Sequence, residues 1–137
     1  MSRSKMKSSA AVLDELLNEA SWLLSHAEAL SDYGRVEEAA GEWARAANCE
    51  EAVACLLDAA QRGQEAAVHR VSGASCYARL GEPARAVTLL RAALSAPLPD
   101  DYRSQIERQL ADVLAETQRG LRQRPLRKTR EKSPAVR

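Results

Sequence analysis

The residues of this chain that are best suited to chemistry are two histidines and three cysteines. His26 and His69 lie far apart in the sequence, and neither belongs to an HExxH motif or stands beside a cysteine at the spacing of a metal ligand. Cys49, Cys55 and Cys76 are odd in number and form no CxxC pair, so they indicate reduced thiols rather than a disulfide framework or a zinc ribbon. We therefore expect no metal site and no cofactor.

A nucleophilic site could be assembled only around His69. Ser72, Ser75 and Cys76 follow it closely, and Glu65 precedes it by one helical turn. No strand-turn-helix elbow leads into these residues, and the glycines form neither a GxGxxG nor a GxxxxGK motif. The sequence predicts a protein that is not an enzyme.

The elements that would position these residues are helical. The 137 residues include 26 Ala and 17 Leu but one Ile and no Phe. Because alanine and leucine are strong helix formers and strand formers are scarce, this composition favours an all-α fold. Apolar residues recur every three or four positions and predict about six antiparallel helices. Their limits are marked by Ser9, Gly34, Asn48, Gly63, Gly81, Asp100 and Gly120 as caps or stops.

Charge divides the chain into three parts. Residues 1–9 carry a net charge of +3 and residues 119–137 one of +7, which leaves −9 for residues 10–118, because the whole chain has +1. We expect flexible basic ends around a helical domain, since the apolar period is missing from both ends. No apolar stretch is long enough for a membrane span or a signal peptide, so the predicted location is the cytoplasm and no membrane partner is expected.

Two segments of the chain repeat one pattern of small and large apolar residues around a glycine. The first copy contains Ala27, Leu30, Gly34, Ala39, Trp43 and Ala46, and the second contains Ala74, Tyr77, Gly81, Ala86, Leu90 and Ala93. The pattern resembles the tetratricopeptide repeat (TPR), although the two glycines are 47 residues apart rather than about 34. The resemblance implies a TPR-like α-solenoid built from stacked helical hairpins.

The resemblance also implies a function. TPR-like arrays hold partner segments on the face lined by the first helix of each hairpin, as adaptors, scaffolds or chaperone-like modules. Mapped onto this chain, the partner-binding residues are Leu24, Glu28, Ser31, Asp32, Val71, Ser75 and Arg79. An apolar or basic protein segment would suit this set. The alternative reading is that these residues only pack against neighbouring helices.

The basic C-terminal tail offers a second function class. Its cations are Arg119, Arg122, Arg124, Arg127, Lys128, Arg130 and Lys132, together with the terminal Arg137. They could bind the phosphates of nucleic acid without sequence preference, because no aromatic residue stands among them to stack on bases. The alternatives are a solubilising terminus, or an arm that folds back on the acidic body of this chain or onto that of a neighbouring copy. Self-association is also expected because short helical arrays expose apolar surface at their ends.

Overall fold

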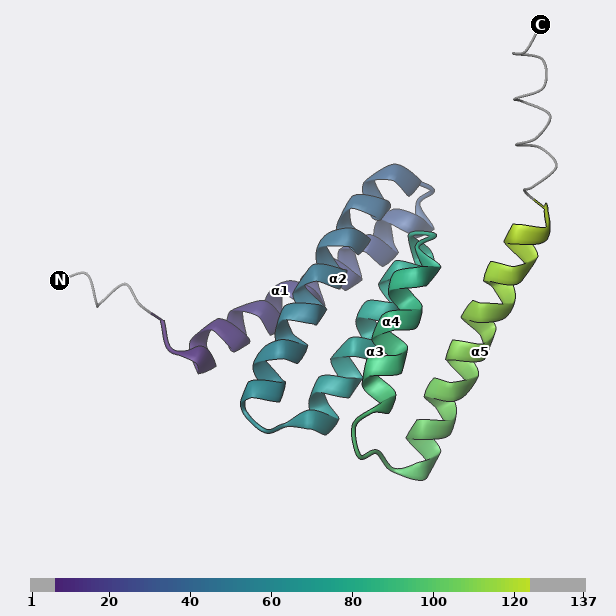
Figure 1. Ribbon diagram of the computed structural model, residues 1–137. Helices are drawn as coiled ribbons and strands as arrows, with labels where there is room; N and C mark the ends of the chain where they lie inside the picture. The colour runs from purple at the N-terminus through teal and green to yellow at the C-terminus, as the bar shows by residue number, and fades with distance from the viewer. Residues whose placement is uncertain (1–6, 124–137) are drawn as a thin grey trace, which may run out of the picture.

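The computed structural model describes residues 7–123, and all regular structure within them is helical (Figure 1). This confirms the all-α fold class. The five helices are α1 (Ser9–Asp32), α2 (Val36–Ala59), α3 (Gly63–Arg79), α4 (Pro83–Leu94) and α5 (Asp100–Gln123). Each helix packs chiefly against its neighbours in chain order, so α1 and α5 lie at opposite ends of the row (Figure 1).

Left-handed glycines end two of the helices, as the sequence predicts. Gly34 follows α1 with φ 79° and Gly81 follows α3 with φ 74°. In each turn the next amide reaches back to a carbonyl of the last helical turn: Arg35 N–H donates to Leu30 over 2.9 Å, and Glu82 N–H donates to Tyr77 over 2.9 Å. This is the Schellman arrangement, which satisfies carbonyls that the helix end would leave free.

The turn after α2 has the same geometry but no glycine at the left-handed position. Gln61 has φ 63°, and Arg62 N–H donates to the Leu57 carbonyl over 2.8 Å. The prediction that Gly63 ends this helix is therefore wrong, because Gly63 is the first residue of α3. The hydrogen bonds of the turn hold Gln61 in a conformation that side chains rarely adopt.

The predicted break at Asn48 is also wrong. Asn48 is exposed in the middle of α2, which runs unbroken for 24 residues, so the expected second and third helices are one helix and the total of six becomes five. No glycine or proline stands between Gly41 and Gly63, and buried alanines lie on both sides of Asn48. A capping side chain cannot start a helix where the backbone before it already has a helical partner.

The ends of the helical domain differ slightly from those predicted. Ser8 rather than Ser9 caps α1, where its hydroxyl accepts a hydrogen bond from Ala11 N–H over 3.1 Å. Helix α5 begins at Asp100 and continues through Gly120 to Gln123. Residues 119–123, predicted to belong to a disordered tail, are thus helical, and the expectations for residues 1–6 and 124–137 lie outside the described residues.

Small side chains make the core and let the helices approach closely. Buried alanines line every helix interface from α1 to α4, and the larger fully buried side chains are Leu23, Val53, Cys76, Leu90 and Ile106. At Gly73 of α3, an added Cβ would lie 3.1 Å from Leu89 Cδ1 of α4 and 3.5 Å from Glu50 Cβ of α2. Close packing of this kind holds α3 in a fixed position relative to α2 and α4.

Candidate functional site

A cleft of about 250 Å³ lies between α1 and α3, and we refer to it as the α1–α3 cleft. Its residues are Leu24, Ser25 and Glu28 of α1, Trp43 of α2, and Ser72, Ser75, Cys76 and Arg79 of α3. Four of the seven predicted partner-binding residues, Leu24, Glu28, Ser75 and Arg79, therefore lie together although they come from segments about 50 residues apart.

Arg79 spans the α1–α3 cleft. Its Nη2 lies 3.2 Å from Glu28 Oε2, and its guanidinium lies 4.5 Å from the centroid of the Trp43 ring. The side chains of Arg79 and Glu28 are both about half exposed, so their ion pair contributes little to stability. A flat guanidinium on an indole keeps its outward donors free for another acceptor.

Helix α5 borders the same face as α1 and α3. Gln109 Nε2 donates to Ser75 Oγ over 3.1 Å, which joins α5 to α3 directly beside the cleft. Ser72 already has a hydrogen-bond partner, because its hydroxyl donates to Glu50 Oε2 over 2.8 Å. Side-chain contacts thus link α1 to α3, through Glu28 and Arg79, and α3 to α5, through Ser75 and Gln109.

The other predicted residues are not part of the cleft. Val71 is half-buried and packs against the core. Ser31 and Asp32 are exposed at the C-terminal end of α1 and do not line the cleft. Trp43 was missed because the repeat pattern assigns it to the core. The four-residue spacing of Ser72 and Cys76 could have placed both of them beside Ser75 and Arg79 on α3.

A second cleft, of about 470 Å³, separates the turn between α3 and α4 from the C-terminal half of α5. It is lined by Ala78, Gly81, Pro83, Val113, Glu116, Thr117, Arg119, Gly120 and Leu121. Ala78 and Arg79 are adjacent in α3 and line different clefts, so α3 forms the ridge between the two. Leu121, which is 60% exposed, adds apolar surface to the α5 side of this cleft, where Glu116, Thr117 and Arg119 also lie.

Beneath the α1–α3 cleft lies a buried carboxylate. The Glu50 side chain is 4% exposed, and His69 Nδ1 lies 2.6 Å from its Oε1, with the Ser72 hydroxyl on its other oxygen. These two partners supply the polar contacts that a buried carboxylate requires. Ser72 and His69 both point to Glu50 rather than to each other, so the histidine does not activate this serine as a base would.

Burial also lowers the reactivity of the Cys76 thiol, which lies close to Glu50. Burial, with the negative charge of Glu50 added to it, raises the pKa of Cys76 to about 11. At neutral pH the sulfur therefore carries its proton, and a thiol in that state is a poor nucleophile. Cys49 is buried as well, and burial raises its pKa too, whereas Cys55 is exposed.

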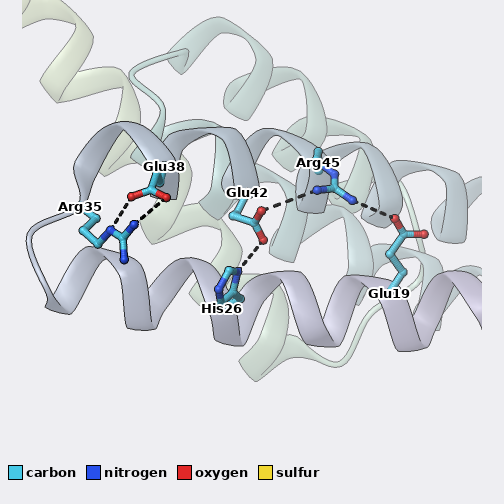
Figure 2. A network of polar contacts seen from close by, with 6 residues as sticks. All are labelled: Glu19, His26, Arg35, Glu38, Glu42 and Arg45. Carbon is cyan, nitrogen blue, oxygen red and sulfur yellow. Dashed lines mark hydrogen bonds and ion pairs between the residues drawn. The ribbon is translucent and has the colours of Figure 1, made fainter.

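The second histidine belongs to a surface network between α1 and α2 (Figure 2). His26 Nδ1 lies 3.0 Å from Glu42 Oε1, and Arg45 bridges Glu42 and Glu19 at 3.6 and 3.8 Å. His26 also stacks on Trp22 with 4.6 Å between ring centroids. The network ties the first two helices together along their exposed edge.

Within residues 7–123, no three His, Cys, Asp or Glu side chains are grouped to hold a metal ion. No helix in the same range is long and apolar enough to cross a bilayer. Comparison of the chain with protein-family models, with curated proteins and with solved structures gives no match.

Proposed function

We propose that this chain is a non-enzymatic interaction module, an adaptor, scaffold or chaperone-like unit, which holds a segment of a partner protein on the face formed by α1, α3 and α5. The observation that carries the proposal is the α1–α3 cleft, where Leu24, Glu28, Ser75 and Arg79 lie around Trp43. Partly exposed side chains of mixed chemistry around a concave surface are typical of a segment-binding groove.

The arrangement of the helices supports a TPR-like solenoid as the architecture behind this function. Contacts from α1 to α3, through Glu28 and Arg79, and from α3 to α5, through Ser75 and Gln109, join alternate helices on one face. In a solenoid of hairpins the first helices of successive pairs meet in this way. On this reading α1–α2 and α3–α4 are the two hairpins and α5 covers the end of the second.

The chemistry of the cleft favours a partner segment with apolar and basic side chains. Leu24 offers apolar surface, and Glu28 is an exposed acceptor whose present partner, Arg79, is held separately by Trp43. An incoming lysine or arginine can take Glu28, while Arg79 turns its donors to the carbonyls of the segment. Because the exchange replaces one exposed ion pair by another, it costs little.

The experiment uses peptides selected from a random display library by binding to the wild-type chain. We expect Leu24→Asp to weaken these peptides at least about tenfold, since it removes about 1.4 kcal/mol or more of apolar contact at the centre of the site. Val68→Asp is the matched control, because Val68 is exposed on α3 and lines neither cleft. Equal binding by wild-type and Leu24→Asp chains would contradict the proposal.

Capture from the native host's lysate separates this function from the alternative. A protein retained at near-stoichiometric yield by wild-type chain, and lost with Leu24→Asp, is the expected result. The alternative is non-specific binding of nucleic acid by the basic residues after Gln118, which include eight lysines and arginines. Material that disappears with nuclease, or when those cations are replaced by glutamine, would favour the alternative instead.

A further inference from the structure

Helix α1 has a second exposed side, which we call the outer stripe and define by Trp22, Ala29 and Tyr33. Seven and then four residues separate them, so they follow one line along the helix. Trp22 is 58% exposed and Tyr33, directly after the helix, is 83% exposed. Neither residue lines the α1–α3 cleft. Two exposed aromatic rings on the terminal helix of an array mark surface that another molecule can cover.

The charge of α1 restricts what can cover the outer stripe. The helix carries five acidic residues and has no lysine or arginine between Ser9 and Asp32: they are Asp14, Glu15, Glu19, Glu28 and Asp32. Three of them are paired with cations from outside the helix, Lys7 with Glu15, Arg45 with Glu19 and Arg79 with Glu28, so the acidic residues still outnumber the cations beside them. Two copies packed symmetrically through α1 would therefore bring carboxylates against carboxylates, which is unfavourable. The remaining negative charge favours a basic occupant, and an arginine in it can stack on the face of the Trp22 indole that His26 does not cover.

The chain itself carries such an occupant at its other end. Residues 119–137 contain eight lysines and arginines and one acid, Glu131. The first of them lie at the end of α5, where exposed Leu121 stands between Arg119 and Arg122. We infer that the basic C-terminal segment of one copy binds the outer stripe of α1 in a second copy, so that the chains associate head to tail.

Length and position favour a second copy over the same chain. The 14 residues after Gln123 can reach about 46–50 Å when extended, whereas the 24 residues of α1 measure about 36 Å. A segment arriving from the next copy can thus follow the whole stripe. Because α1 and α5 lie at opposite ends of the row (Figure 1), the chain's own segment would spend part of its reach crossing the array.

The test is the mass of the full-length chain in solution, measured by sedimentation from micromolar to millimolar concentration. We expect the mean mass to rise with concentration at about 0.1 M salt and to fall back at about 1 M, where the Debye length shrinks from about 10 to about 3 Å. Trp22→Ser should weaken association at least about tenfold, and Val68→Ser should leave it unchanged because Val68 lies on α3.

A mixture of two variants tests the head-to-tail direction. Trp22→Ser keeps the basic segment, and a chain with R124Q, R127Q, K128Q and R130Q keeps the outer stripe. Each variant alone should associate at least about tenfold more weakly than wild-type chain, whereas an equimolar mixture should form a one-to-one complex at a concentration where neither variant associates alone. Wild-type chain that is monomeric throughout, a mixture that forms no complex, or association that is undiminished in Trp22→Ser would each overturn the inference.

Discussion

At the scale of single residues, Glu50 is the described polar side chain whose burial depends most on compensating contacts. Its carboxylate is almost fully buried between α2 and α3, and its stability depends on the two side chains that contact it, His69 and Ser72. His26 and Glu42 make the same type of contact, but the His26 side chain is 42% exposed and Glu42 has Arg45 as a further partner. The two histidines therefore allow a direct comparison between a buried and a more exposed histidine–glutamate contact.

We expect His69→Ala to lower the free energy of unfolding by about 2–4 kcal/mol, because it leaves a buried carboxylate with one partner. His26→Ala should cost about 1 kcal/mol or less, since Glu42 keeps Arg45 and solvent. Urea unfolding monitored by circular dichroism measures both values. A loss for His69→Ala no larger than that for His26→Ala would show that Ser72 and water are sufficient for Glu50.

The thiols give a second prediction at this scale. Iodoacetamide at neutral pH should label Cys55 and spare Cys76, which is buried and whose pKa is raised to about 11. Mass spectrometry of the digested protein after a short pulse reports each site. The raised pKa also determines how stability depends on pH. The unfolded chain releases the Cys76 proton at lower pH than the folded chain does, so the contribution of Cys76 to stability is lost as pH rises from 9 towards 11. Rapid labelling of Cys76 in native protein would contradict this assignment.

At the scale of elements, the three turns between α1 and α4 show what sequence can and cannot reveal. Gly34 and Gly81 were predictable because glycine adopts the left-handed conformation without a penalty. The turn at Gln61 was not, because hydrogen bonds to the end of α2, rather than its own preference, hold it there. The helix break predicted at Asn48 was wrong for the opposite reason. The capping ability of Asn48 is a local property, whereas the burial of the alanines around it depends on the whole fold.

Gln61→Gly should therefore stabilise the protein. Glycine removes the strain of a left-handed side chain, worth about 1–2 kcal/mol, and gives back part of it as extra entropy in the unfolded state. The expected net gain is about 1 kcal/mol, or a few degrees in Tm. Gly34→Gln is the reverse substitution, in the turn after α1, and it should lower the Tm by a similar or larger amount. A drop in Tm for Gln61→Gly would mean that the Gln61 side chain itself supports the turn.

At the scale of the whole molecule, the repeat pattern predicted some of the residues that line the α1–α3 cleft but not Trp43. Leu24, Glu28, Ser75 and Arg79 were assigned to one face by aligning the two repeated segments, and all four line the cleft. Trp43 was assigned to the core, and it is buried, yet its ring also forms one side of the cleft. Whether a residue at a helix interface also borders an opening depends on the angle between helices, which side-chain spacing does not determine.

The one-dimensional packing of the row also predicts how local stability varies along it. Each inner helix packs against two neighbours, whereas α1 and α5 each pack chiefly against one. Amide hydrogens of α2 and α3 should consequently exchange most slowly, and those of α5 after Val113, its last buried residue, should exchange much faster. Hydrogen exchange followed by mass spectrometry at low protein concentration tests this order.

If the end of α5 were as protected as α2, the end of the row would be covered, either by another part of the same chain or by a second copy. Repeating the measurement at high concentration would then separate these cases, because only protection by a second copy increases with concentration.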